Sequence, residues 1–413
     1  MRFGVFYELQ LPKPWDETSE HRLFHEALDQ VVLADRLGID HAWAVEHHFL
    51  EEYSHCSSPE VFLAAAAART ERIRIGHGIR QVIPNYNHPA RTAEGLAALD
   101  LISNGRVEFG IGEGATRLEL HGFDIPAKEK RQIAIETAEQ IANMMVMTPY
   151  PGFEGRWFSM PCRNVIPKPM QKPHPPMWMA CTNRDTIRVA ASLGLGALAF
   201  SFVDPDEAKA WSSIYYDTIK SDACVPIGHT VNANIAMVSA FSIHPDREEA
   251  IRRGQEGFEF FGYALGSLVM RDAKPGRSRL AESFQEQRAS SRGEDAVTVD
   301  LPAMDSRHAP GIGTPNDFRE HVREFQAAGV DQIILMQQAG AARHEDICAS
   351  LELFAAEVLP EFKAVVAARE AAKAEELAPF IEAALARKTY MAELTDDEIP
   401  IVKASAAAPK VNG

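Results

Sequence analysis

The sequence predicts a (β/α)8 barrel of the TIM type, in which eight parallel strands form a ring inside a layer of helices. Short apolar segments rich in β-branched and aromatic residues alternate along the chain with segments whose apolar residues recur at helical spacing. Strands that alternate with helices form a parallel sheet, because each helix returns the chain across the sheet. A repeat of this kind that runs eight times is typical of a closed barrel.

The elements follow in a regular order. Strands are expected at residues 3–7, 39–45, 73–78, 106–112, 177–180, 197–200, 231–239 and 331–336. Helices are expected at 21–37, 57–68, 88–101, 129–147, 183–193, 204–219, 245–265, from 314 onward and at 345–369. Gly38 and Asn104-Gly105 are helix-ending residues, whereas Ser58-Pro59 and His88-Pro89 place a proline in a first turn, where it is tolerated.

Three segments depart from the repeat. Residues 149–176 contain eight prolines, too many for a helix, and predict an extended insertion. Residues 267–312 show little periodicity and predict a long irregular connection, either a lid or a disordered segment. We therefore divide the chain into a barrel at 1–365 and a charged, Ala-rich extension at 366–413. The extension is expected to be helical first and of low complexity at 404–413, and to pack on a partner subunit or float free.

Composition narrows the class of protein. The net charge of −16 argues against nucleic acid or an anionic membrane as a partner. Five widely spaced cysteines without a C-x-x-C pair favour reduced thiols over a disulfide framework or a zinc site. No apolar run of membrane-spanning length occurs, and the first strand begins directly after Met1, so neither a membrane span nor a signal peptide is expected. These features predict a cytoplasmic location.

Glu46-His47-His48 follows the second predicted strand. Polar side chains at the carboxyl end of a barrel strand occupy the face on which active sites of this fold are built. Successive strand residues point to opposite sides, so one of the two histidines faces the barrel mouth. A single histidine suits a base or a hydrogen-bond donor, and the missing H-x-H pattern argues against a metal site.

Two further strand ends carry candidate binding residues. Gly110, Gly112 and Gly114 end the fourth strand, where they would let a flat ligand approach the backbone or simply form a tight turn. Residues 181–184, Cys181-Thr182-Asn183-Arg184, follow the fifth strand at a helix start, which suits a phosphate or an ordinary capped helix. The residues alone leave both alternatives open.

Several motifs together carry a resemblance. VEHHF at 45–49, His88-Pro89 with Ala93-Glu94, LDLISNGRVEFGIGEG at 99–114 and HGFD at 121–124 occur in the order found in bacterial luciferase-like flavin monooxygenases. The resemblance covers residues 1 to about 365 and implies a TIM-like barrel that is usually a homodimer. It also implies that reduced FMN (FMNH2), supplied by a separate flavin reductase, reacts with O2 to form a C4a-peroxyflavin that oxygenates a small apolar organic substrate.

The same resemblance assigns candidate residues. His47 corresponds to the histidine near the flavin, and Gly78 lies at the end of strand three, often a cis peptide against the flavin ring. Gly110, Gly112 and Gly114 match the glycine-rich strand end, and Cys181, Thr182, Asn183 and Arg184 match the phosphate-binding turn. The arginine that completes the phosphate site is left open among Arg184, Arg131 and Arg80.

The departures from the family pattern also matter. Gly112 stands where light-emitting luciferases have a reactive cysteine, and Glu113 where they have an arginine, which removes the case for bioluminescence. Two alternatives keep the fold: hydride transfer with the deazaflavin F420, and a non-catalytic subunit of a heterodimer. The second histidine of the E-H-H triplet speaks against the first, and the intact triplet speaks against the second.

Overall fold

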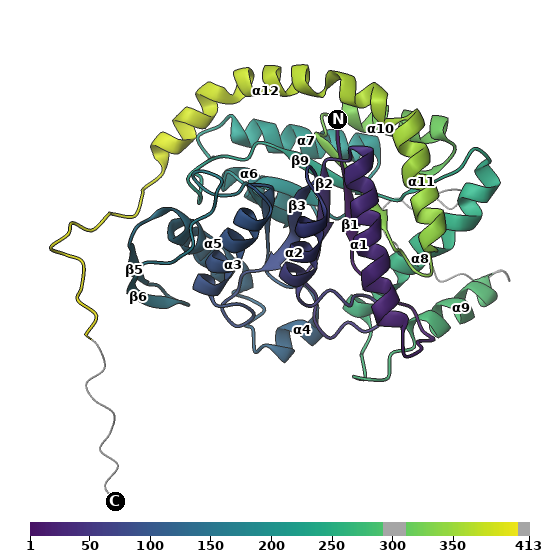
Figure 1. Ribbon diagram of the computed structural model, residues 1–413, viewed down its shortest axis with the longest axis horizontal. Coiled ribbons are helices and arrows are strands. Elements are labelled where there is room, and N and C mark those ends of the chain that lie inside the picture. Colours follow the sequence, from purple (N-terminus) through teal and green to yellow (C-terminus); the bar gives the residue numbers. More distant parts are fainter. Residues whose placement is uncertain (292–310, 404–413) are drawn as a thin grey trace, which may run out of the picture.

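A computed structural model describes residues 1–291 and 311–403 and shows a closed parallel barrel, as the sequence predicted (Figure 1). Eight strands form the barrel, in the order β1-β12-β9-β8-β7-β4-β3-β2. Their bounds are β1 (Arg2–Tyr7), β2 (His41–Ala44), β3 (Arg74–Gln81), β4 (Val107–Gly112), β7 (Met177–Cys181), β8 (Gly196–Ala199), β9 (Ile235–Ser239) and β12 (Gln332–Gln337).

The pairing of the first strand with the last closes the ring. β1 pairs in parallel with β2 on one side and with β12 on the other, from Arg2 opposite Gln332 to Tyr7 opposite Gln337. Every other neighbouring pair in the ring is parallel as well. The carboxyl ends of all eight strands therefore meet at one end of the barrel.

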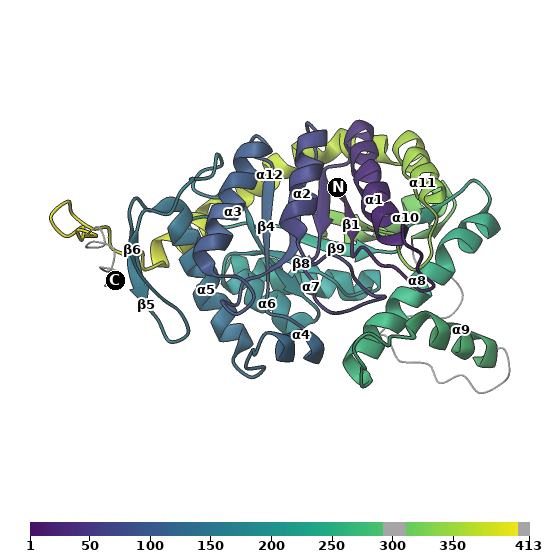
Figure 2. The ribbon, with the colours of Figure 1, turned by 60° about the horizontal axis from the view of Figure 1, so that its bottom comes forward.

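Helices surround the barrel (Figures 1 and 2). The enclosing helices are α1 (Ser19–Leu37), α2 (Pro59–Arg69), α3 (Pro89–Ile102), α5 (Lys130–Val146), α6 (Arg184–Ser192), α7 (Pro205–Ile219), α8 (Arg247–Met270), α10 (Pro315–Ala327) and α11 (His344–Glu357). Each turns an apolar face to the strands, as Ala27, Val31 and Ala34 of α1 do, none of which is exposed. No helix in the described ranges is long and apolar enough to cross a membrane.

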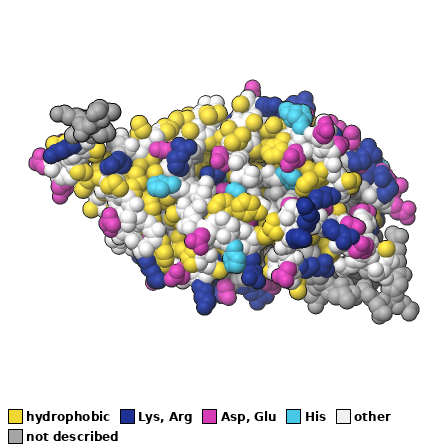
Figure 3. Space-filling model, turned by 90° about the horizontal axis from the view of Figure 1, so that it is seen from below, with side chains coloured by type: hydrophobic (Ala, Val, Ile, Leu, Met, Phe, Trp, Pro, Cys, Tyr) yellow, Lys and Arg dark blue, Asp and Glu magenta, His cyan; other side chains and the backbone are white. Residues whose placement is uncertain are grey.

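Smaller elements lie outside this repeat. The proline-rich insertion is extended, as predicted, and contains an antiparallel hairpin of β5 (Tyr150–Glu154) and β6 (Ser159–Arg163). β10 (Ser242–Ile243) and β11 (Ile312–Gly313) form a short parallel pair. A short helix that the sequence analysis did not expect, α4 (Arg117–Gly122), follows β4 at the carboxyl end of the barrel, which Figure 3 views from below.

The prediction of an irregular connection at 267–312 was wrong for much of its length. α8 continues to Met270, and α9 (Leu280–Ser291) forms a further helix, while residues 292–310 lie outside the described part of the chain. The fully buried carboxylate of Glu52 accepts hydrogen bonds from the backbone N–H groups of Leu280 (2.8 Å) and Ala281 (3.0 Å). Because these are among the unpaired N–H groups of a first turn, a distant residue stabilises the start of α9.

The closing helix is also divided. Val358 separates α11 from α12 (Leu359–Arg387), and Pro360 in the first turn of α12 favours a break there. α12 crosses the amino ends of the strands (Figure 1). It is held there by ion pairs from Glu370 to Arg2, from Lys363 to Asp40 and from Lys373 to Asp331, the last with an N–O distance of 2.7 Å. This helix therefore covers the end of the barrel opposite the carboxyl ends.

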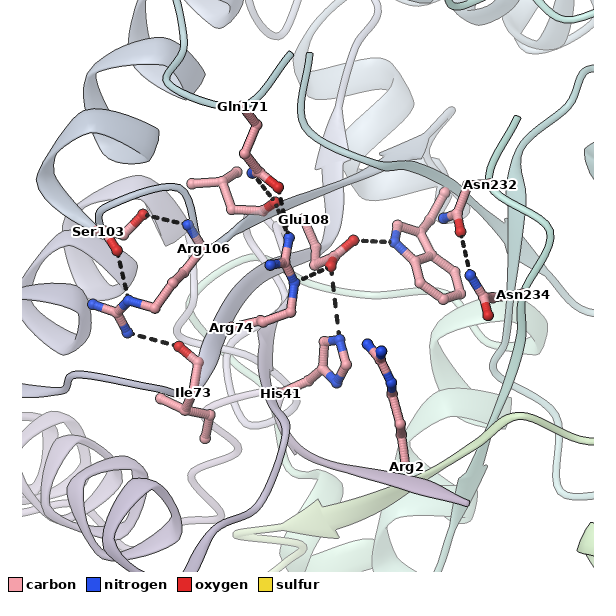
Figure 4. A network of polar contacts seen from close by, with 12 residues as sticks. Arg2, His41, Ile73, Arg74, Ser103, Arg106, Glu108, Gln171, Asn232 and Asn234 are labelled. Carbon is pink, nitrogen blue, oxygen red and sulfur yellow. Dashed lines mark hydrogen bonds and ion pairs between the residues drawn. The ribbon is translucent and has the colours of Figure 1, made fainter. Parts of the chain in front are cut away.

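A buried carboxylate organises the interior of the barrel near its amino end (Figure 4). Glu108 of β4 forms an ion pair with Arg74 of β3, accepts a hydrogen bond of 2.6 Å from the indole N–H of Trp178, and lies 3.7 Å from Nε2 of His41. The Arg74 guanidinium also donates to Gln171 of the insertion at 2.8 Å. Glu108 thus joins β4 to three other barrel strands and, through Arg74, to the insertion.

Replacement of Glu108 by Ala should lower the stability of the fold by about 3–5 kcal/mol, because it leaves the Arg74 guanidinium without its buried partner. The midpoint of denaturant unfolding measures this loss. Asp185→Ala is the matched control, because Asp185 is an acid in an exposed ion pair with Arg188 and should leave the midpoint almost unchanged. Equal midpoints for the two variants would contradict this account of Glu108.

Candidate active site

A cavity of about 270 Å³ opens at the carboxyl ends of the strands. Its walls are mostly apolar, and its polar groups are few. The lining residues are Phe6, Glu8, Val45, Glu46, His47, Tyr53, Gly78, Ile79, Gln81, Ile111, Gly112, Glu113, Gly114, Ala115, Lys130, Arg131, Ala134, Ile135, Met179, Ala180, Thr182, Thr186, Phe200, Val238, Phe261 and Leu265. An apolar pocket with a few convergent polar groups, at this end of a barrel, is a candidate active site.

His47 lies between two carboxylates in the wall of this cavity. Its Nδ1 is 2.9 Å from Oε1 of Glu119, and its Nε2 is 3.7 Å from Oε2 of Glu8. Burial opposes a charge on the imidazole, but the two carboxylates outweigh burial and raise the pKa of His47 to about 9. The imidazole is therefore protonated at neutral pH and can give up a proton inside the cavity.

The two carboxylates differ in their surroundings. Burial raises the pKa of Glu8 to about 7, although His47 and a 3.0 Å hydrogen bond from the Tyr53 hydroxyl oppose this rise. Burial also acts to raise the pKa of Glu119, but His47, the Thr116 hydroxyl (2.8 Å) and the backbone N–H of His48 (3.1 Å) together hold it below its usual value. Glu119 thus stays charged, while Glu8 can change its charge near neutral pH.

The other histidine of the triplet points elsewhere, as the strand geometry predicted. His48 does not line the cavity; its Nε2 is 3.2 Å from Oε1 of Glu46, and its ring stacks on Tyr86. Glu46 also accepts hydrogen bonds from the backbone N–H of Gln81 (2.9 Å) and from Asn87 (2.8 Å). Glu46 and His48 therefore fix the strand end that presents His47.

The predicted glycines divide into two groups. Gly78, Gly112 and Gly114 line the cavity, and the peptide bond that follows Gly78 is cis. Gly110 does not line it: a Cβ there would lie 2.2 Å from the carbonyl oxygen of His77, so its role is close packing of β4 against β3. A Cβ on Gly112 would lie 2.1 Å from the Ile79 side chain, so this glycine also allows β3 to approach.

Of the four residues predicted after the fifth strand, only Thr182 lines the cavity. The Cys181 side chain is buried against the carbonyl oxygens of Met179 and Thr186, and the Asn183 side chain accepts a hydrogen bond of 3.0 Å from the Thr186 N–H at the start of α6. Arg184 is exposed and forms an ion pair with Glu207. The helix start is therefore capped by its own side chains.

The structure instead brings two cations from α5 to this side of the cavity. Lys130 and Arg131 both line it, as Thr182 does, and both pair with Glu113, at N–O distances of 3.4 Å and 3.2 Å. Arg80 does not line the cavity; it pairs with Glu60 and lies 3.6 Å from Glu46. Of the three arginines left open by the sequence, the structure places only Arg131 in the cavity wall.

Some functional groups were missed by the sequence analysis. Glu8 follows β1 directly and shares the strand-end position that drew attention to His47, so the same rule could have found it. Glu119 was hidden in a segment expected to be a loop, although Thr116 and Glu119 have the T-x-x-E spacing of a capping box. Here the Glu119 side chain binds His47 rather than the backbone of Thr116. The described residues contain no group of three or more side chains that could hold a metal ion.

The proton on His47 should make the stability of the protein depend on pH. Its folded-state pKa of about 9 lies above the ordinary value of 6.5, so its contribution is fully present below pH 6.5 and lost as the pH rises to about 9. His47→Gln lacks this contribution at every pH. The gap in unfolding temperature between the wild type and His47→Gln should therefore shrink over this range. His25→Gln, which changes an exposed histidine, is the control, and a gap that stays constant for His47→Gln would refute the raised pKa.

Comparisons with known proteins agree with this architecture. The sequence profile described as luciferase-like monooxygenase matches residues 1–332. The oxygenase component of the flavin-dependent trigonelline monooxygenase of Acinetobacter baylyi is 24% identical over 365 residues, which cover 88% of this chain and 96% of that protein. A monooxygenase of known structure from Streptomyces bottropensis is 28% identical, with a TM-score of 0.70 over 88% of this chain and 100% of that one.

The oxygenating constituent of 3,6-diketocamphane monooxygenase from Pseudomonas putida, solved with FMN, is 20% identical, with a TM-score of 0.67 over 87% of this chain and 98% of that one. F420-dependent enzymes have the same fold and also align with most of the chain. Relatives of this chain thus use flavin-type cofactors, either FMN or F420. By the profile that matches 332 of its residues, the chain belongs to the luciferase-like monooxygenase family.

Proposed function

We propose that this protein is the oxygenase component of a two-component monooxygenase that uses reduced FMN and O2 to oxygenate a small organic substrate. The observation that carries the proposal is the position of His47, a protonated imidazole between Glu8 and Glu119, in the wall of an apolar cavity at the carboxyl end of the barrel. When bound there, reduced FMN would supply the two electrons that activate O2.

The residues of the cavity suit a flavin. Oε2 of Glu8 and Oε1 of Gln81 are buried without a hydrogen-bond partner and border the cavity, where they could accept hydrogen bonds from a ligand. Ile79, Ile111 and Met179 offer apolar surface to a planar ring system. At the other side, the cations Lys130 and Arg131 and the hydroxyl of Thr182 suit a phosphate group.

His47 is the group that can hold or move a proton in this cavity. Nδ1 is engaged by Glu119, which leaves Nε2 as the ring nitrogen that can exchange a proton with a reacting group. Glu8, 3.7 Å from Nε2, can take or return that proton because its own pKa is about 7. The Tyr53 hydroxyl bound to Glu8 fixes the orientation of this carboxylate.

The apolar walls have a second effect, because they exclude water from the reacting groups. Phe6, Phe200 and Phe261 line the cavity, and they favour a substrate with an apolar skeleton. The side chains of Trp43 and Trp178 pack edge to face and do not border the cavity. The proposal includes a flavin reductase that supplies FMNH2 and a homodimeric assembly, as in the family pattern.

The phosphate side of the proposed site can be tested by binding. Arg131→Ala should weaken the binding of reduced FMN by about 10- to 150-fold, because it removes a charge-assisted contact worth roughly 1.5–3 kcal/mol. Anaerobic fluorescence titration measures the dissociation constant. Arg184→Ala is the control, because this arginine pairs with Glu207 outside the cavity and should change the constant less than about twofold. A larger effect of Arg184→Ala than of Arg131→Ala would indicate that the phosphate binds at the start of α6.

The chemistry can be tested by mixing the FMNH2-loaded protein with O2 in a stopped-flow instrument. The wild-type protein should slow the return of flavin absorbance relative to free FMNH2, and His47→Gln should shorten this delay and release more hydrogen peroxide. His25→Gln, which changes an exposed histidine outside the cavity wall, is the control. Oxidation at the rate of free flavin would refute the proposal. Tight binding of reduced F420 in place of FMNH2 would support hydride transfer. If the protein bound neither cofactor, it would be better explained as a non-catalytic subunit.

A further inference from the structure

A second cavity, of about 180 Å³, lies beside the candidate active site. Two elements line both cavities, and a third, α4, lines the second cavity and contacts His47 of the first. Tyr53 borders the first cavity and Leu50 the second, both from the loop after β2. On α8, Leu265 borders the first cavity and Leu268 borders the second. Three residues of a helix span only about 4.5 Å, so the two cavities adjoin along α8. α4 contributes Glu119, which holds His47, and Leu118, which borders the second cavity.

The second cavity is strongly basic. The described residues that line it include four cations, Arg271, Lys274, Arg277 and Arg279, and two acids, Glu51 and Asp272. This excess of cations stands out on a chain with a net charge of −16. Figure 3, which views this end of the barrel, shows Lys and Arg side chains gathered on the side where α8 and α9 lie.

Three of these cations have no acidic partner in the described part of the chain, and the side chains of two of them, Lys274 and Arg277, also form no hydrogen bond or ion pair with another side chain there. Arg279 pairs with Glu282, and Arg271 donates to the Tyr263 hydroxyl at 2.7 Å. The Arg277 guanidinium donates only to the carbonyl oxygen of Gly276, and the Lys274 ammonium has no hydrogen bond or ion pair there. Lys274 and Arg277 are therefore available to an anion that enters the cavity.

The segment that carries these cations is fixed to the barrel. Glu51 accepts hydrogen bonds from the backbone N–H groups of Gly276 (2.7 Å) and Ser278 (3.2 Å). Glu52, which is fully buried, accepts from the hydroxyl of Ser278 (2.7 Å) and caps α9. A basic segment that is already held in place loses little conformational freedom when it binds an anion, which favours binding.

We infer that the second cavity is an anion subsite and that the substrate of the proposed monooxygenase is amphipathic, with an apolar body in the first cavity and a carboxylate or sulfonate group beside Lys274 and Arg277. The inference rests on the proposed function for the identity of the first cavity. The expected substrate is thus apolar over most of its length and acidic at one end. Binding of the acidic end in the second cavity would fix which end of the molecule faces His47.

A pair of fluorescent probes with the same skeleton tests the inference without any flavin. 1-Anilinonaphthalene-8-sulfonate carries one anionic group, and N-phenyl-1-naphthylamine is its neutral counterpart. The wild-type protein should bind the sulfonate more tightly than the amine, and added salt should weaken only the binding of the sulfonate. Lys274→Ala/Arg277→Ala should weaken binding of the sulfonate about tenfold and leave the amine unchanged.

Arg188→Ala/Arg252→Ala is the matched control, because it removes the same net charge from two exposed ion pairs elsewhere. It should leave the binding of both probes unchanged. Equal binding of the two probes by the wild type, or an equal loss in both double variants, would overturn the anion subsite. Because no flavin is present, these outcomes are independent of the FMN experiments, whose failure would overturn the proposed function alone.

Discussion

Closure of the ring by β1 and β12 is the constraint on which the rest of the structure depends. The two strands lie some 330 residues apart in sequence, yet they pair along their whole length from Arg2 to Tyr7. Because the neighbouring strands β1, β2, β3, β4 and β7 are all parallel, their carboxyl ends lie on one rim, and closure of the ring curves that rim around a cavity. Glu8, His47 and Gly112, which are scattered over a quarter of the chain, become neighbours in one wall for this reason.

The two ends of the barrel use charge in different ways. At the amino end, each buried charge has a fixed partner: Glu108 holds Arg74, and α12 pairs with residues beside three strands. At the carboxyl end, acids and bases border open space, and Oε2 of Glu8 and Oε1 of Gln81 have no hydrogen-bond partner in the described part of the chain. The paired charges at the amino end stabilise the fold, whereas the polar atoms at the carboxyl end are free to bind a ligand.

The barrel could be predicted from the sequence because hydrophobic periodicity is local. His47 could be found for the same reason, since it stands where an apolar strand ends. The groups that the sequence analysis missed depend on contacts between distant residues. α9 begins where Glu52 caps it across 228 residues, and Arg184, which matched the family turn, is drawn away by Glu207. Arg131 was one of three candidate arginines, and no local pattern distinguished it from the other two, because its place in the cavity follows from how α5 packs.

Glu119 connects the ionisation of His47 to the folding of α4. Its carboxylate binds the protonated imidazole of His47 and also accepts a hydrogen bond from Thr116 at the start of α4. The protonation of His47 and the folding of the first turn of α4 are therefore energetically coupled. Leu118 in the same turn borders the basic cavity. By thermodynamic reciprocity, a ligand that orders this turn increases the proton affinity of His47, and protonation increases the affinity for that ligand by the same factor. Occupancy of the basic cavity by the proposed substrate would therefore be linked to the protonation of His47.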